Sequence, residues 1–237
     1  MDGATTKSLY WQGVRAGVPF LLVVMPFGLL FGVVATEAGL TAWQTMAFSS
    51  VVFAGASQFA ALQLMVENAP MAIVVATALA VNLRMAMYSA SLATYLGDAP
   101  FLTRALVAYV NVDQSYAVAV NTFEDRPDLT TPQKVGYFFG AVTPIVPMWI
   151  VATALGVWLG EGIPPSMALD FAVPICFLAI IAPMMRTLAH MLAAVTSIVV
   201  ALLLAGVPYN LGLLAAAGTA MIVGAQVEVW QDQRTRR

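Results

Sequence analysis

Charged side chains are scarce in this chain, and cysteine is almost absent. Asp, Glu, Lys and Arg make up 9 % of the 237 residues, against about 25 % in soluble domains, whereas hydrophobic residues make up 61 %. A mean hydropathy of +0.86 excludes an ordinary water-soluble domain and indicates a protein that crosses the lipid bilayer several times. At about 20 residues per crossing plus short turns, the length accommodates roughly seven or eight helices and no separate soluble domain.

Further absences exclude other classes of function. The formal net charge of −2 provides no basic patch, so no nucleic acid partner is expected. Cys176, the lone cysteine, and His190, the lone histidine, have no sequence context for a disulfide or a metal site. The phosphate-binding motif G-x-x-x-x-G-K-[ST] does not occur, and no serine has the base partners of a nucleophilic triad. We therefore expect neither an enzyme nor a cofactor.

Apolar segments separated by turn residues predict an all-α transmembrane helical bundle that forms one transporter domain over residues 1–237. Segment 105–123 is the least suited to face lipid, because it contains Asn111, Asp113, Gln114 and Asn121. Either neighbouring helices shield it, or it is re-entrant or broken, which would reduce eight crossings to seven. The expected crossings are 17–36, 44–66, 71–96, 105–123, 135–160, 168–185, 188–206 and 210–227.

The distribution of lysine and arginine predicts the orientation in the membrane. With eight crossings, the cytoplasmic side receives Lys7, Arg15, Arg126, Lys134, Arg186, Arg234, Arg236 and Arg237. Arg104 is the exception. We therefore expect a multi-pass protein of the cytoplasmic membrane with both termini in the cytoplasm.

A weak internal repeat is also visible. The pattern Phe-Ala-x4-Phe occurs at 53–59 and again at 171–177, and a segment with two prolines precedes each copy. Transporters are commonly built from repeats, with the binding site at the repeat interface, so 1–123 and 124–237 are possible halves. Eight crossings make these halves parallel, whereas a re-entrant segment 105–123 makes them inverted.

Arg84 is the most informative residue, because it lies near the middle of the expected crossing 71–96. A guanidinium there costs several kcal/mol unless it is paired or lines a wet cavity. Arg84 is about a dozen residues from either end of the helix, too far to reach an interface easily. Its helical face continues through Tyr88, Ser91 and Tyr95, whereas Asn82 lies on nearly the opposite face. An ion pair with Asp113 and a role in binding a substrate carboxylate or in gating are both open.

Asp113 is the second charge expected inside the membrane. It shares one helical face with Tyr109 and Tyr116 and lies two residues after Asn111, and an unpaired carboxylate there would seek a cation. Arg84 is the available partner. If substrate or a proton competes for this pair, Asp113 is the coupling group, although a permanent structural pair fits equally well.

Small and polar residues interrupt the expected crossing 44–66 at its centre. Gly55, Ser57, Gln58 and Phe59 lie there, and such residues let helices pack closely. Alternatively, a glycine that loosens the helix beside Ser57 and Gln58 would expose backbone groups that hold an ammonium or a carboxylate. Asp170, at the start of segment 168–185, completes the candidate site residues.

Four motifs, in order along the chain, resemble the AzlC-type large subunit of branched-chain amino acid exporters. They are Phe53-Ala-Gly-Ala-Ser-Gln-Phe59, Asn82-Leu-Arg84 followed by Tyr88 and Ser91, the Asp-Gln-Ser-Tyr-Ala run from Asp113, and Leu169-Asp-Phe-Ala172 with Pro174 and Phe177. Met85 and Gln114 depart from the family pattern, which often has histidine or tyrosine at the first position and glutamate at the second. The resemblance implies export of valine, leucine or isoleucine driven by the proton-motive force, and a small AzlD-type membrane subunit as partner.

Several functions remain open at this point. A secondary exporter predicts substrate efflux that depends on Arg84 and Asp113. A permease subunit of an ATP-driven transporter predicts an ATPase partner, and a transporter of another small solute is a further alternative. A membrane-embedded enzyme predicts product formation in detergent, and a membrane scaffold predicts that no polar residue inside the membrane matters.

Overall fold

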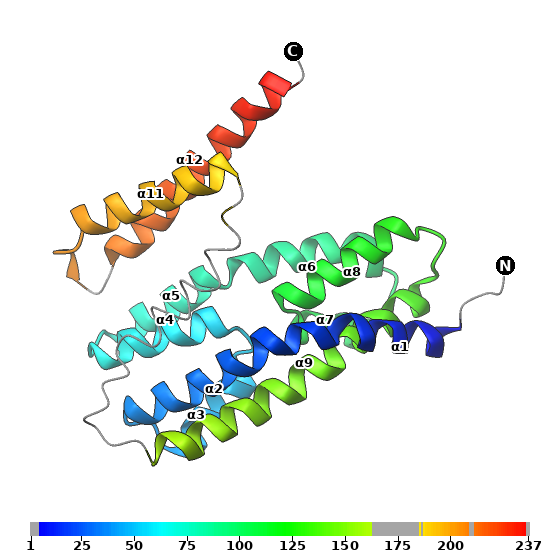
Figure 1. Ribbon diagram of the computed structural model, residues 1–237, viewed down its shortest axis with the longest axis horizontal. Coiled ribbons are helices and arrows are strands. Elements are labelled where there is room, and N and C mark those ends of the chain that lie inside the picture. The colour runs from blue at the N-terminus through cyan, green and yellow to red at the C-terminus, as the bar shows by residue number, and fades with distance from the viewer. Residues whose placement is uncertain (1–4, 163–184, 186, 209–210, 236–237) are drawn as a thin grey trace. The chain divides into compact units, whose positions relative to one another are not determined.

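The computed structural model describes residues 5–162, 185, 187–208 and 211–235 (Figure 1), and all the regular elements in these ranges are helices, as predicted. The expected crossing 168–185, the second copy of the Phe-Ala-x4-Phe pattern and Asp170 lie outside the described residues. The chain forms two compact units. Unit 1 consists of Met1–Leu62 and Ala78–Ala168, and unit 2 of Gln63–Thr77 and Leu169–Arg237.

Four helical segments in the described part of the chain are long and apolar enough to cross a membrane. They are Thr6–Glu37, Met71–Leu96, Thr131–Gly160 and Leu211–Gln231. The first comprises α1 (Thr6–Gly17), the 3-10 turn η1 (Val18–Phe20) and α2 (Leu21–Glu37). It begins earlier than the expected 17–36, because the Thr5 hydroxyl caps α1 by accepting a 3.2 Å hydrogen bond from Ser8 N.

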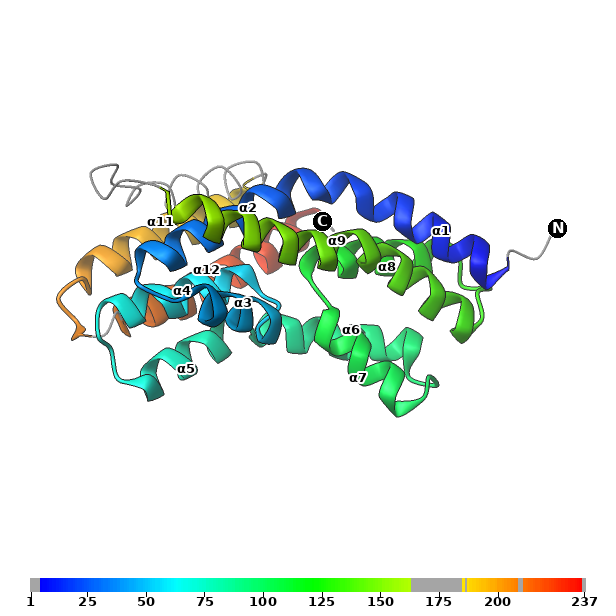
Figure 2. The same cartoon turned by 90° about the horizontal axis from the view of Figure 1, so that it is seen from below.

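The expected crossing 44–66 is wrong. The chain forms α3 (Ala42–Val51) and α4 (Gly55–Val66), separated by a non-helical turn at 52–54. Phe31 of α2 contacts both Phe48 of α3 and Phe59 of α4, each with ring centroids 5.6 Å apart, so the two short helices lie at the same depth. The chain doubles back at this turn (Figure 2), and we interpret α3 and α4 as a re-entrant pair, here called the first hairpin.

Segment 105–123 is broken, as one of the two alternatives predicted. Helix α7 (Phe101–Val110) ends before Asn111, and α8 (Asp113–Asp125) begins after Val112. Consequently Tyr109 and Asp113 lie on different helices and do not share one helical face.

These two helices also form a re-entrant hairpin, here called the second hairpin. Helix α8 runs antiparallel to α6 (Leu83–Leu96), since Asp113 contacts Arg84 and Glu124 contacts Tyr95. Helix α7 starts only five residues after the end of α6, so both ends of the second hairpin lie at one end of unit 1.

The helix over Met71–Leu96 is interrupted once. Helix α5 (Met71–Val81) and α6 are separated by Asn82, although Asn82 N still donates to Ala78 O at 3.1 Å and Met85 N donates to Asn82 O at 2.9 Å. The two helices therefore remain one span with a local irregularity.

Glycines join the first span to α9 (Thr131–Gly160) along its length. A Cβ atom on Gly13 or Gly140 would collide with the backbone of the other helix, and the same holds for Gly32 and Gly156. Gly13 faces Gly140, and Gly32 faces Gly156. Residue numbers therefore increase in the same direction along both helices, which run parallel (Figure 1). This contact is called the glycine interface below.

Parallel packing constrains how the chain crosses the membrane. Two parallel spans require an odd number of crossings between them. One crossing by 71–96, with both hairpins re-entrant, satisfies this condition, whereas a re-entrant segment 105–123 beside a crossing at 44–66 does not.

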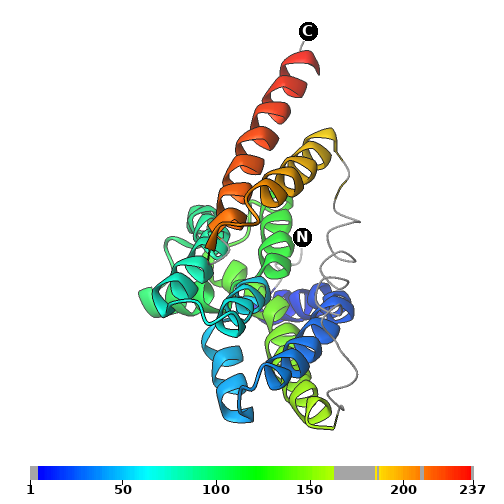
Figure 3. The same cartoon turned by 90° about the vertical axis from the view of Figure 1, so that its left-hand side faces the viewer.

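In unit 2, α11 (Leu188–Leu203) and α12 (Leu211–Thr235) form an antiparallel pair (Figure 3). A Cβ atom on Gly212 would meet Leu204, and one on Gly224 would meet Ala193 at 3.3 Å. His190 lies in the first turn of α11, where its backbone N donates to the Thr187 hydroxyl. The expected crossings 188–206 and 210–227 fall in this pair, and α12 extends past the expected end.

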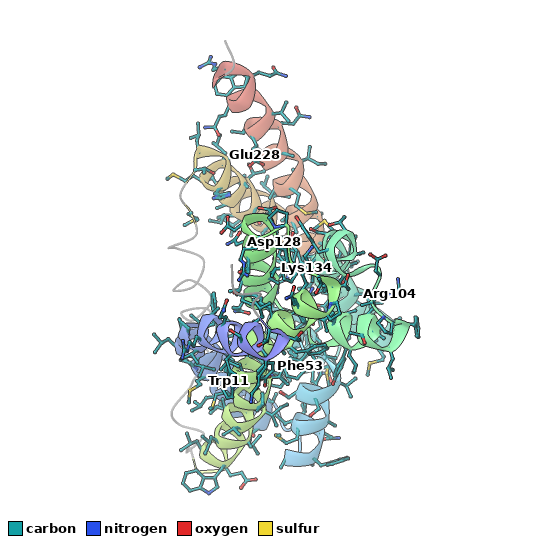
Figure 4. The ribbon with its side chains drawn as sticks, turned by 90° about the vertical axis from the view of Figure 1, so that its right-hand side faces the viewer. Trp11, Phe53, Arg104, Asp128, Lys134 and Glu228 are labelled. Carbon is teal, nitrogen blue, oxygen red and sulfur yellow. The ribbon has the colours of Figure 1, made fainter. Side chains whose placement is uncertain are left out.

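Apart from Arg84, the basic residues of unit 1 lie at one end, here called the basic end. Arg126 Nη1 lies 3.5 Å from Gln12 Oε1, which brings the end of the second hairpin to α1. Figure 4 looks onto this end and shows Arg104, Asp128 and Lys134. Arg104, the exception in the eight-crossing interpretation, therefore joins Lys7, Arg15, Arg126 and Lys134.

We expect cysteines at Asp98 and Asp128 to be labelled by a membrane-impermeant maleimide from the same side of the membrane. Both positions are exposed and lie at the two ends of the second hairpin. The measurement uses a Cys176→Ala background and vesicles of known orientation. A cysteine at exposed Glu67 is the control and should react from the opposite side. Labelling of Asp98 and Asp128 from opposite sides would restore the eight-crossing topology.

Candidate functional site

Polar side chains gather where the helices of unit 1 are interrupted, at 52–54, at Asn82 and at 111–112. Among the described residues, six buried side-chain atoms have no hydrogen-bond partner in the protein, and five of them belong to residues next to these interruptions. The six atoms are Thr45 Oγ1, Gln58 Oε1, Asn82 Oδ1, Arg84 Nε, Asn111 Nδ2 and Asp113 Oδ1. An unpaired buried polar atom costs about 1–3 kcal/mol, so this region is suited to water or a polar solute.

Arg84 and Asp113 form an ion pair, with 3.0 Å between Arg84 Nη1 and Asp113 Oδ2. Asp113 is the first residue of α8, where the positive end of the helix dipole favours a carboxylate. Arg84 is the second residue of α6, directly after the end of α5, so the opposed ends of the two helix dipoles give the cation no net stabilisation, and the carboxylate supplies it instead. Arg84 Nε and Asp113 Oδ1 remain unpaired, so each partner can form a further hydrogen bond with water or a polar solute.

The ion pair is only partly covered by the protein. The Arg84 side chain is 35 % exposed and that of Asp113 is 41 % exposed. Charges at the middle of a span do not face lipid stably, so a hydrated cavity or another protein surface has to cover them.

The face of α6 that was predicted from Arg84 onward lies against α8. Tyr88 stacks on Tyr116, with ring centroids 4.2 Å apart and planes 12° from parallel. The Tyr116 hydroxyl donates to Ser91 Oγ at 3.1 Å, and the Tyr95 hydroxyl donates to Glu124 Oε1 at 3.4 Å. The structure therefore brings Arg84, Tyr88, Asp113 and Tyr116 together.

The tip of the first hairpin is held by its own polar side chains. Ser57 Oγ donates to Ala54 O at 3.2 Å, and Gln58 Nε2 donates to Val52 O, which replaces helical hydrogen bonds at the interruption. Both side chains are fully buried. Phe59 packs between Phe27 and Phe31, with ring centroids 5.6 Å from each, so its place in the fold is that of a core residue.

The tip of the second hairpin is held in a similar way. Ser115 Oγ donates to Asn111 Oδ1 at 3.4 Å and accepts from Val112 N at 3.0 Å. Asn111 is 2 % exposed, and its amide nitrogen has no partner. The Asn82 side chain forms no capping bond to α6, and its Oδ1 is likewise unpaired.

The two hairpins meet at their tips. The Tyr109 hydroxyl donates to Ser50 O, and the Tyr109 ring contacts Phe53 with centroids 6.2 Å apart. Phe53 and Val112 pack against one apolar cluster, which has Val24, Ile145 and Trp149 at its centre. The interruption beside Gln58 is thereby brought next to the interruption beside Asp113.

Trp149 is a residue of this region that the sequence reasoning missed. Its Nε1 donates to Ser49 Oγ at 2.8 Å, and Ser49 Oγ lies 3.0 Å from Thr153 Oγ1. A Cβ atom on Gly55 would lie 3.0 Å from the Trp149 ring, so Trp149 contacts both helices of the first hairpin. The available signal was an indole in the middle of a span, since its N–H needs a partner that lipid does not supply.

Metal binding has no support in the described residues, where no three His, Cys, Asp or Glu side chains are close enough together to hold an ion.

Full spans that enclose re-entrant hairpins with charged and amide side chains at mid-depth define a helical membrane protein of the transporter type. A family model described as AzlC protein matches residues 19–163. This is more than half of the chain, so the chain belongs to the AzlC family.

Two relatives are named as membrane proteins. An uncharacterized membrane protein of Archaeoglobus fulgidus is 29 % identical over 206 residues, which cover 85 % of this chain and 87 % of the relative. The inner membrane protein YgaZ of Escherichia coli K12 is 23 % identical over 183 residues, which cover 74 % of this chain and 73 % of the relative. No solved structure matches the chain.

We expect Arg84→Ala and Asp113→Ala each to reduce the yield of folded protein, because each leaves an unpaired charge in the span at a cost of about 3 kcal/mol. The double variant should recover most of the loss. The measurement is the melting temperature and the monodisperse yield in detergent. Arg104→Ala, at an exposed position outside the pair, is the control. Equal damage in both single variants and the double variant would argue against the pair.

We also expect Gly55→Ala to destabilise the protein, because the added methyl group meets the Trp149 ring and overpacking costs about 1–3 kcal/mol. The effect should be smaller in a Trp149→Phe background, since the shorter ring leaves space. A double-mutant cycle on thermal unfolding in detergent measures this coupling. Gly218→Ala, where nothing lies within 4 Å of the added atom, is the matched control, and additive effects would contradict the contact.

Proposed function

We propose that this chain is the large subunit of a secondary transporter that exports aliphatic amino acids such as valine, leucine and isoleucine across the cytoplasmic membrane. The observation that carries the proposal is the Arg84–Asp113 pair, which lies beside a helix interruption and keeps unpaired atoms on both partners. A site with one cation and one anion that are both partly available is complementary to a zwitterion.

Recognition of the zwitterion follows from the charges. The substrate carboxylate binds to the Arg84 guanidinium, whose geometry suits carboxylates. The ammonium binds to Asp113 Oδ1, and the unpaired Oδ1 of Asn82, two residues before Arg84, is a further acceptor. The aliphatic side chain packs against the apolar hairpin tips, where Phe53 and Val112 lie.

Proton coupling is assigned to Asp113. It is the carboxylate of unit 1 that lies at mid-depth, whereas the other described Asp and Glu residues of this unit lie at or beyond the ends of the spans. A proton on Asp113 removes the charge that holds Arg84, so protonation and substrate binding compete for the same pair. Outward movement of substrate is thereby linked to inward movement of protons.

A small AzlD-type membrane subunit is proposed as the partner. The family resemblance implies it, and the half-exposed ion pair is a surface that lipid does not cover stably. Packing of small residues against another helix would hold the two proteins together, since lipid provides no hydrophobic driving force.

The two alternative functions are a permease subunit of an ATP-driven transporter and a transporter of another small solute. Both are compatible with the fold and with the family. They differ from the proposed exporter in energy source and in the chemistry of the solute, so one transport assay addresses both.

We expect proteoliposomes that contain this chain and its small partner to move labelled valine in response to an imposed proton gradient without ATP. Arg84→Ala and Asp113→Ala should abolish this transport, whereas Arg104→Ala should retain it. Leucine, isoleucine and methionine should compete, because one methylene changes binding by only about 1–3 kcal/mol. Transport that requires ATP and an ATPase would favour the permease, and preference for a charged solute would reject the zwitterion site.

A further inference from the structure

Helices α6 and α8 carry a continuous polar contact from the ion pair to the basic end. It passes from Arg84–Asp113 to the stacked rings of Tyr88 and Tyr116, then to Ser91, and ends where Tyr95 meets Glu124. We call the set Tyr88, Ser91, Tyr95, Tyr116 and Glu124 the polar seam.

The polar seam is accessible in unit 1, and one negative and one positive side chain, Glu124 and Lys134, lie where it reaches the basic end. Its members are half-buried, except for Glu124, which is exposed. Lys134 Nζ lies 5.5 Å from the centre of the Tyr95 ring and 5.9 Å from that of Phe123. A cation and an anion therefore flank the point where the seam opens at the basic end.

Among the described residues, helix α5 provides no comparable polar contacts in the other direction from the ion pair. Beyond Asn82, helix α5 has the sequence MAIVVATALAV, with Thr77 as its one polar side chain. The hairpin tips pack around the apolar cluster of Phe53, Val112 and Trp149. Along the span of α5 and α6, polar side chains therefore continue from the ion pair toward the basic end and not along α5.

We propose that the polar seam is the hydrated path by which a small zwitterion reaches Arg84 and Asp113 from the basic end, with the Tyr88–Tyr116 stack as its narrowest point. This inference rests on the proposed function. The tyrosines suit such a path, because their rings pack in the apolar span while their hydroxyls contact water or solute. A seam that only joins two helices would exclude water instead.

Cysteine accessibility separates these two cases. Ser91→Cys in a Cys176→Ala background is treated with a positively charged, membrane-impermeant methanethiosulfonate from either side of oriented vesicles. The control is Ala93→Cys, two residues away on nearly the opposite face of α6. We expect Ser91→Cys to react at least about tenfold faster, because only a hydrated thiol ionises to the reactive thiolate. The reaction should occur from the basic end alone, and valine should slow it.

The effect of the label on transport completes the test. Valine transport by Ser91→Cys is compared before labelling, after labelling and after release of the label with a reductant, so that each sample is its own reference. We expect labelling to block transport and reduction to restore it. Slow labelling of Ser91→Cys, labelling from the other side, or a labelled protein that transports normally would overturn the path.

Failure of the path and failure of the proposed function give different results. If the unmodified chain with its partner transports valine but labelling has no effect, the path is wrong and the exporter stands. If no aliphatic amino acid is transported, the proposed function fails, and the rate and sidedness of labelling still decide whether the polar seam is hydrated.

Discussion

The bilayer offers no water to backbone groups, and this constraint governs how unit 1 is built. A helix that stops at mid-depth leaves donors and acceptors unpaired, which is tolerated only where protein covers the interruption or where it lines a cavity. Both hairpins meet the condition partly with their own side chains, Gln58 in the first and Ser115 in the second. Four of the six unpaired atoms belong to the ion pair itself or to Asn82 and Asn111, each two residues before one partner, so the cost of breaking the helices creates the polar site.

The glycine interface provides the rigid part on which these interruptions depend. Gly13, Gly32, Gly140 and Gly156 let the first span and α9 approach backbone to backbone, which only glycine permits at such distances. Trp149 projects from α9 toward the first hairpin and contacts both of its helices. The hairpin tips, in contrast, are joined by the Tyr109–Ser50 hydrogen bond and apolar side chains. Rearrangement is therefore easier at the tips than at the glycine interface.

Sequence reasoning succeeded where a residue conflicts with its surroundings. Arg84 and Asp113 could be paired because two opposite charges inside a membrane have few other partners, and Asn111 marked the broken segment. The first hairpin was missed because its turn, Val52-Phe53-Ala54, is apolar, so hydropathy alone cannot distinguish one crossing from two half-length helices. The glycine interface depends on residues far apart in sequence, such as Gly13 and Gly140, which no local pattern connects.

The positions of the two charges also bear on the binding site that we propose. The start of α8 stabilises the Asp113 carboxylate by about 0.3–1 kcal/mol or somewhat more when partly buried, whether or not Arg84 contacts it. Arg84, at the start of α6, has no such support and gains most from an anion. A substrate carboxylate that takes the place of Asp113 beside Arg84 therefore leaves a carboxylate that its own helix still stabilises. That carboxylate is then free to hold the substrate ammonium, so the arrangement favours exchange of partners over a permanent bond.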